Sequence, residues 1–187
     1  MTTQKQSTFF PLLPSKEKKA RPLPVVGYDV IYADPPWRYQ FSQTKRRKIE
    51  NHYDTMALED ICALKVPSAK DSVLFMWVTP PKMEEGMRVI NAWGFTYRTC
   101  MVWVKDKIGM GYYVRQKHEI LTISIKGSPG TPEPKHRPKS VFYGMRREHS
   151  KKPSMYSLIE HMYPGRKYLE LFARNTAEGW TSWGNQA

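Results

Sequence analysis

The fold of this chain follows from one stretch near its start, Tyr28-Asp29-Val30-Ile31-Tyr32-Ala33-Asp34-Pro35-Pro36-Trp37. Its β-branched and aromatic residues predict a buried strand that ends at an acidic residue. The two prolines should keep Asp34 and Pro35 extended or polyproline-like. Because proline has no N–H, the corner offers acceptors, the Asp34 carboxylate and the Pro35 carbonyl, and few donors. We expect it to bind a donor-rich group such as an amino group. Trp37 adds either a flat face for stacking a base or, in the plainer alternative, core filler behind a Pro-Pro turn.

Strands and helices are expected to alternate along the rest of the chain. Apolar or alternating runs predict strands at 28–33, 72–78, 96–105, 118–126, 140–143, 168–172 and 181–184. Helical spacing predicts helices near 58–64, at 82–92 and at 154–163, the last of them capped by Ser154. This alternation predicts an α/β fold with a largely parallel sheet. Ligands of such sheets bind beyond the carboxyl ends of strands, where Asp34, Thr79 and residues 172–174 fall.

Length and composition fit one domain of 187 residues. We assign residues 1–24 to a basic, proline-rich N-terminal arm and residues 25–187 to the domain. No apolar run approaches the roughly 20 residues of a membrane span, and the N-terminus has no signal-peptide pattern. The two cysteines lie far apart, without the spacing of a zinc site, which favours reduced thiols in a cytosolic protein. We therefore expect no metal and no membrane association.

The net charge of +13 is unevenly distributed. Residues 1–24 net +4, residues 38–50 net +4 and residues 126–152 net +6. These stretches are the expected arm and two expected loops, so the excess charge is placed to attract a polyanion such as nucleic acid. The alternative is that the basic surface only aids solubility.

Motifs along the chain resemble those of the MT-A70 family of adenine N6-methyltransferases. Residues 34–37 match the D/N-P-P-Y/F/W motif of amino-group methyltransferases in its tryptophan form. Further segments are similar to the family in the same order: 77–80, 92–95 with 102–105, 109–113, 118–119, 149–153, 168–174 and 180–186. The likeness covers roughly residues 25–187.

The resemblance implies a Rossmann-like class I methyltransferase fold, a mostly parallel sheet flanked by helices, with S-adenosyl-L-methionine as cofactor. It implies that the catalytic residues are those of the corner, Asp34, Pro35, Pro36 and Trp37. The family's cofactor-binding pattern falls on Asp34, His118, Glu170, Phe172, Arg174, Asn185 and Gln186. For His118, a strand-start histidine bonded to backbone is the alternative. Arg174 and Thr176 replace the glycines of the related F-x-G-x-G motif, which leaves the backbone path of 172–176 open.

Substrate contacts are expected from rings and from loop cations. Trp37 and Tyr39 would stack on a flipped adenine. The cations are Lys45, Arg46, Arg47, Lys48, Arg137, Lys139, Arg146 and Arg147. Since the loops 38–53 and 127–152 follow strand ends, both are expected to flank the pocket mouth as a nucleic-acid cradle.

The expected chemistry needs no metal and no covalent intermediate. Asp34 and the Pro35 carbonyl would bind the two N6 hydrogens, and that binding tightens as positive charge develops on the nitrogen. A minimal core of this kind resembles a bacterial or phage enzyme. It would act on DNA adenine as a monomer or homodimer, in the cytoplasm of a bacterial or phage-infected host cell. The alternatives are an RNA adenine methyltransferase, a non-catalytic nucleic-acid-binding protein of the same fold, and methylation of a protein amide or small amine.

Overall fold

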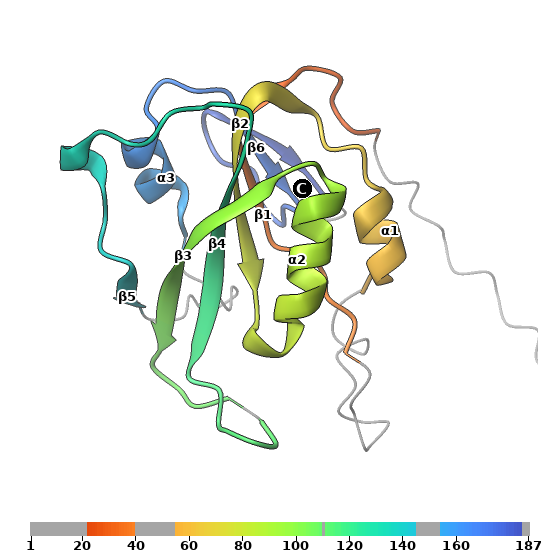
Figure 1. Ribbon diagram of the computed structural model, residues 1–187, viewed down its shortest axis with the longest axis vertical. Helices are drawn as coiled ribbons and strands as arrows, with labels where there is room; N and C mark the ends of the chain where they lie inside the picture. The colour runs from red at the N-terminus through yellow and green to blue at the C-terminus, as the bar shows by residue number, and fades with distance from the viewer. Residues whose placement is uncertain (1–21, 40–54, 110, 145–153, 185–187) are drawn as a thin grey trace, which may run out of the picture.

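A computed structural model describes residues 22–39, 55–109, 111–144 and 154–184. Within them, one seven-stranded sheet forms the centre of the molecule (Figure 1). Its strands are β1 (Tyr28–Ala33), β2 (Ser68–Val78), β3 (Thr96–Lys105), β4 (His118–Lys126), β5 (Val141–Gly144), β6 (Tyr168–Leu171) and β7 (Trp180–Trp183). They lie in the order β5-β3-β4-β2-β1-β6-β7.

The sheet is mostly parallel. The pairs β1–β2, β1–β6, β6–β7 and β3–β5 are parallel, and both antiparallel pairs involve β4. Strand β4 therefore runs against the other six. Its start lies at the edge where its neighbours end, since Val78 pairs with Ile120 and Val104 pairs with His118.

Helices cover both faces of the sheet, as expected for the Rossmann-like methyltransferase fold (Figure 1). They are α1 (Leu58–Ala63), α2 (Met83–Ala92) and α3 (Tyr156–Met162), with the short 3-10 helices η3 (Pro80–Lys82) and η4 (Pro134–His136). Among the described residues, no helix is long and apolar enough to cross a membrane.

Alternating side chains of the strands form two hydrophobic cores, one on each face. On one face, Val30 and Tyr32 of β1 join a cluster that includes Ile159 of α3. On the other face, Ile31 and Ala33 join a cluster with residues of α1 and α2. The central strands are buried on both faces, which explains the continuous apolar runs of β1 and β2.

Most element boundaries lie within one residue of expectation, and the largest differences are at β2 and α3. Strand β2 begins at Ser68, because Ser68 pairs with Tyr28 although 68–71 lack an apolar pattern. The predicted Ser154 cap is wrong: α3 is preceded by Met155 at its N-cap, and no side chain caps it. Burial of Ile159 and Met162 against the sheet stabilises this short helix instead.

The predicted nucleic-acid cradle is wrong for the start of the loop 127–152, because β4 runs in the reverse direction. Lys126, at the end of β4, pairs with Ser72 in the first half of β2, so the chain after β4 leaves toward the edge opposite Asp34. Figure 1 shows the segment from β4 to η4 at the top, while β2 and β3 point downward. Arg137 and Lys139 follow η4 in that segment. The chain returns toward the lower edge only along β5.

Candidate active site

The candidate site residues lie at the edge of the sheet where the parallel strands β1, β2 and β6 end. Strand β1 delivers Asp34 there, β2 delivers Thr79 and β6 delivers Phe172. Because β4 is reversed, its first residues, His118 and Glu119, lie at the same edge. The site is thus assembled from four strands that are far apart in sequence.

Residues 34–37 form a tight, hydrogen-bonded corner. The Trp37 N–H donates to the Pro35 carbonyl at 2.9 Å, and the Met56 N–H donates to the Pro36 carbonyl at 3.0 Å. The expected free acceptor at Pro35 is therefore partly engaged. A carbonyl oxygen has two lone pairs, so Pro35 can still accept one further hydrogen bond. Asp34 remains half-buried at the surface of the corner.

Trp37 belongs to the core, which corrects its predicted role as an open stacking face. The residue is 7% exposed and packs with Ile61 and Met76 in the cluster beneath α1 and α2. Its indole N–H donates to the Trp77 carbonyl at 3.3 Å. The alternative in which Trp37 is core filler therefore fits the structure, and the indole anchors the corner to β2.

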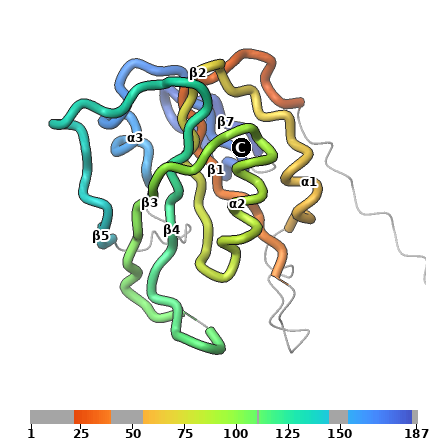
Figure 2. Tube along the Cα trace, in the orientation of Figure 1, coloured from red at the N-terminus to blue at the C-terminus, as the bar shows by residue number. Residues whose placement is uncertain are grey.

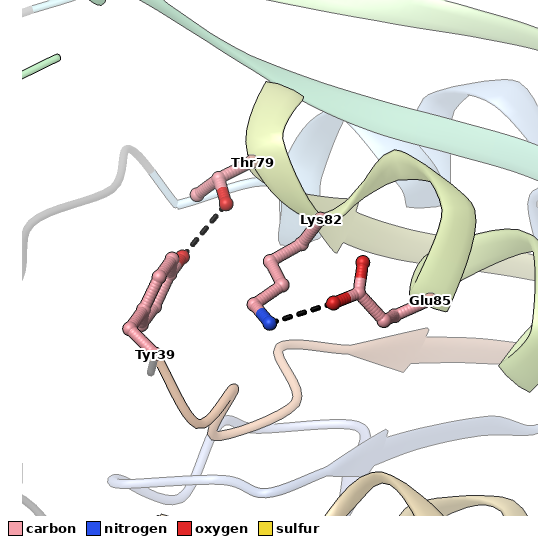
Figure 3. A network of polar contacts seen from close by, with 4 residues as sticks. All are labelled: Tyr39, Thr79, Lys82 and Glu85. Atoms are coloured by element: carbon pink, nitrogen blue, oxygen red, sulfur yellow. Dashed lines mark hydrogen bonds and ion pairs between the residues drawn. The ribbon is translucent and has the colours of Figure 1, made fainter. Parts of the chain in front are cut away.

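Tyr39 is the aromatic side chain at the corner that is half-exposed. Its hydroxyl lies 2.7 Å from Oγ1 of Thr79, and Nζ of Lys82 lies 5.4 Å from the ring centroid (Figure 3). Lys82 is held there by an ion pair with Glu85 at 2.7 Å. Burial raises the pKa of Tyr39; the hydrogen bond with Thr79 opposes this, and the charges of Glu119 and Asp34 add to it. The phenol therefore stays protonated at neutral pH.

Two pockets flank the sheet at opposite ends. The smaller, of about 320 Å³, lies beside the corner and is lined by Trp37, Arg38, Lys82, Glu85 and Arg88, among others. The larger, of about 790 Å³, is lined by residues of 98–101, 123–140 and 162–163, around the start of β3 and the end of β4. It lies away from Asp34, so pocket size alone does not mark the active site.

Glu170 forms a second polar cluster, on the α3 face. It is 9% exposed within β6, and the Tyr156 hydroxyl of α3 donates to its Oε2 at 2.5 Å. Burial raises the pKa of Glu170 to about 7; the Tyr156 hydrogen bond opposes the shift and the charge of Asp34 adds to it. Asp34 thus acts electrostatically on both Glu170 and Tyr39.

The ends of β6 and β7 form a close-packed backbone platform. Phe172 has a φ of 62°, a left-handed conformation that is uncommon for a residue other than glycine. The chain turns there, and the Ala173 N–H donates to the Trp183 carbonyl at 2.9 Å. A Cβ at Gly184 would collide with the Ala173 carbonyl oxygen. These contacts define the backbone conformation of residues 172–174, which the sequence did not predict because Arg174 replaces a glycine of the related motif.

An ion pair joins the end of β3 to the start of β4. Nζ of Lys105, at the end of β3, lies 2.6 Å from Oε1 of the buried Glu119. The neighbouring His118 is half-buried and pairs with Val104 in the β3–β4 ladder. Its place at this edge keeps it within the candidate site.

Comparison with known proteins places these features in a family. The sequence pattern that defines the MT-A70 family matches residues 28–186. The chain belongs to the MT-A70 family.

Individual relatives include both bacterial and eukaryotic methyltransferases. This MT-A70 chain is 35% identical over 199 residues to the type II methyltransferase M.MunI of a Mycoplasma species, covering 94% of this chain and 80% of that protein. It is 34% identical over 171 residues to a putative N(6)-adenosine-methyltransferase MT-A70-like protein of Medicago truncatula. It is 28% identical over 170 residues to the N(6)-adenosine-methyltransferase catalytic subunit METTL3 of Homo sapiens. Each of these two alignments covers 85% of this chain but only 26% and 28% of the plant and human proteins.

The MT-A70 structure brings some predicted site residues together and separates others. Asp34, Tyr39, His118 and Phe172 share one edge, with Glu170 one residue inside β6. Arg174 is exposed just beyond that edge, whereas Arg137 and Lys139 leave from the opposite one. Other predicted residues lie outside the described part of the chain: Lys45, Arg46, Arg47, Lys48, Arg146, Arg147, Asn185 and Gln186.

Sequence reasoning gave no role to three residues of the candidate site: Tyr156, Lys105 and Glu119. Glu119 had a signal, because a carboxylate at the head of an apolar strand must find a partner. Tyr156 had none, since its hydroxyl meets a strand 14 residues later in the chain only through the packing of α3.

Proposed function

We propose that this MT-A70 protein transfers the methyl group of S-adenosyl-L-methionine to the N6 amino group of adenine in nucleic acid, with DNA preferred. The observation that carries the proposal is the acceptor corner itself. Asp34 stands at the carboxyl end of β1, within electrostatic reach of both Glu170 and Tyr39, on a turn fixed by Pro35 and Trp37.

The exocyclic amine of adenine is a weak nucleophile because its lone pair is delocalised into the ring. Asp34 and the remaining lone pair of the Pro35 carbonyl would accept its two hydrogens. This holds the amine in a geometry that frees the nitrogen lone pair. The two hydrogen bonds strengthen as the nitrogen becomes positive, so they stabilise the transition state more than the ground state. Alignment of the amine with the methyl carbon supplies the remaining acceleration.

The residues at the ends of β6 and β7 fit the cofactor. The buried Glu170 carboxylate can accept hydrogen bonds from ribose hydroxyls, and its strand neighbour Ser182 has a buried Oγ without a partner among the described residues. When bound, S-adenosyl-L-methionine supplies an electrophilic methyl group. We propose that Asp34, His118, Glu170, Phe172 and Arg174 hold it, with Asn185 and Gln186 following the Gly184 platform.

Nucleic acid is the substrate class that best accounts for the charge of +13. The type II designation of M.MunI, a relative covered over 80% of its length, favours DNA. RNA is the second candidate, because the N(6)-adenosine-methyltransferases of plants and animals match 85% of this chain. We propose that Lys45, Arg46, Arg47 and Lys48, together with Arg146 and Arg147, contact phosphates. The enzyme would work in the cytoplasm of a bacterial or phage-infected cell.

The proposal is tested by incubating the protein with methyl-labelled S-adenosyl-L-methionine and a panel of duplex DNA, single-stranded DNA and RNA. Nucleoside mass spectrometry should find labelled N6-methyladenine, with the highest yield from DNA. Higher yield from RNA would shift the assignment to the second candidate. Cofactor binding without transfer to any nucleic acid would instead support a non-catalytic nucleic-acid-binding protein.

A further inference from the structure

The connection between β3 and β4 carries an unusual set of exposed side chains. Among the described residues, eight large hydrophobic side chains are exposed, and six of them lie on this connection or on the neighbouring strand β5. On the connection they are Ile108, Tyr112, Tyr113 and Val114. Tyr112 is 76% exposed and Tyr113 is 102% exposed, as open as a tyrosine in an extended peptide.

Two backbone hydrogen bonds close the base of this connection into a hairpin. The Lys105 N–H donates to the Lys117 carbonyl at 2.8 Å, and the Gly109 N–H donates to the Gln116 carbonyl at 2.7 Å. A Cβ at Gly111 would collide with the Val114 carbonyl oxygen, so the tip requires glycine there.

The hairpin projects from the edge of the sheet that carries Asp34. It begins where β3 ends and finishes where β4 starts with His118. Figure 2 shows it extending below the neighbouring elements, at the end toward which β2 and β3 run. A substrate whose adenine occupies the Asp34 corner would therefore lie at the same edge of the sheet as the hairpin. Tyr143 of β5, which is 80% exposed, pairs with Val104 beside the base of the hairpin.

The positive charge of the hairpin favours a negatively charged partner. Residues 106–117 carry three Lys or Arg side chains and one Asp. Exposed aromatic rings between cations match the requirements of unpaired nucleic acid, whose bases stack on rings while its phosphates meet the cations. A second copy of the chain would bring two positively charged tips together, which like-charge repulsion opposes.

We propose that the β3–β4 hairpin is a nucleic-acid-binding finger, in which Tyr112 and Tyr113 stack on unpaired bases next to the target adenine, flanked by Lys107 and Lys117. This inference rests on the proposed function for its substrate class, and it names a contact outside the catalytic corner. The finger would hold the strand around a flipped or unpaired adenine, since a base that leaves the helix exposes the faces of its neighbours.

The test separates stacking from charge. The variant Tyr112→Leu/Tyr113→Leu keeps apolar area but removes both rings. Fluorescence anisotropy is measured with a labelled oligodeoxyadenylate and with an abasic oligomer of the same length, which carries the same phosphates and no bases. We expect affinity for the oligodeoxyadenylate to fall by roughly tenfold or more, and affinity for the abasic oligomer to stay unchanged.

The matched control is Val25→Ser/Val26→Ser, which removes two exposed apolar side chains just before β1, at the other end of the sheet. This control should bind both oligomers as the wild type does. Calorimetric affinity for S-adenosyl-L-methionine and the thermal midpoint should be unchanged in both double variants, because all four side chains are exposed.

Two results would overturn the finger. The first is that the wild type methylates nucleic acid and the Tyr112→Leu/Tyr113→Leu variant binds the oligodeoxyadenylate as tightly as the wild type does. The other is a Tyr112→Asp/Tyr113→Asp variant that lowers the mass in sedimentation without changing nucleic-acid affinity, which would assign the tip to self-association. If the wild type shows the ring-dependent affinity yet methylates no nucleic acid, the proposed function fails while the finger stands.

Discussion

The hydroxyl of Tyr156 donates a hydrogen bond to Oε2 of Glu170 across 2.5 Å and so joins helix α3 to strand β6. The carboxyl group that receives it is buried, and Asp34 lies near enough to raise its pKa. The protonation state of Glu170 therefore depends on helix α3, strand β6 and Asp34 together. Two predictions test this dependence.

Replacing Glu170 by Gln should change how stability depends on pH. The pKa of Glu170 is raised from 4.5 to about 7 in the fold, so the folded state binds this proton more tightly than the unfolded chain. The resulting stability is complete below pH 4.5 and is lost as the pH rises toward 7. In urea unfolding, the wild type should lose stability relative to Glu170→Gln across that window, at up to about 1.4 kcal/mol per pH unit.

The control for this series is Glu133→Gln, since Glu133 pairs with Lys135 on the surface. It should follow the wild type at every pH. Parallel curves for the wild type and Glu170→Gln would mean that Glu170 ionises alike in the folded and unfolded chains.

Replacing Tyr156 by Phe should weaken cofactor binding in a pH-dependent way. The lost hydrogen bond favours the carboxylate, so its removal raises the pKa of Glu170 further. Less carboxylate would then be available at neutral pH to accept from the ribose. We expect roughly tenfold weaker affinity for S-adenosyl-L-methionine at neutral pH, with partial recovery in more alkaline buffer.

Isothermal titration at several pH values checks this prediction. Tyr163→Phe is the matched control, because its hydroxyl donates to the Gly130 carbonyl at 3.4 Å, near the larger pocket. An equal loss of affinity at every pH would assign Tyr156 to packing alone.

Asp34→Ala should abolish methyl transfer while the protein keeps its fold, because Asp34 is half-buried beyond the end of β1 and outside both hydrophobic clusters. Asp34→Asn should retain weak activity, since the amide accepts through one oxygen. The loss of one preorganised polar contact typically costs about 10²–10³ in rate. Single-turnover transfer to DNA is the measurement, with circular dichroism as the check on folding. Turnover of Asp34→Ala at the wild-type rate would remove Asp34 from the mechanism.

Gly184→Ala should damage both stability and cofactor affinity. The added Cβ meets backbone atoms of Ala173, which cannot move aside as a flexible side chain could. Gly165→Ala is the comparison, because Gly165 has a φ of 67° and no atom within 4 Å of its added Cβ. That variant should cost about 1–2 kcal/mol from conformation alone and leave cofactor affinity intact.

Thermal unfolding and calorimetry distinguish the two glycine variants. A Gly184→Ala protein with unchanged cofactor affinity would show that the platform of residues 173–184 does not support the cofactor site.

The sequence alone determined the strand that ends at Asp34 and most of the elements around it. Strands β1, β3 and β4 have the predicted bounds, because alternating or continuous apolar residues and the breakers beside them are local signals. The family motifs identified the methyltransferase class for the same reason, since they are short ordered strings. Each of these features depends on residues that are neighbours in the chain.

Only the tertiary structure decided what each site residue touches. Trp37 is buried in the core beneath α1 and α2, where its indole N–H donates to the carbonyl of Trp77, 40 residues away. Burial within the fold raises the pKa of Glu170 to about 7, and the charge of Asp34 adds to this shift. Arg137 lies at the far edge because β4 runs against its neighbours. A local pattern predicts that a segment forms a strand. The direction of that strand and the partners of its side chains follow from long-range pairing, which a single segment does not encode.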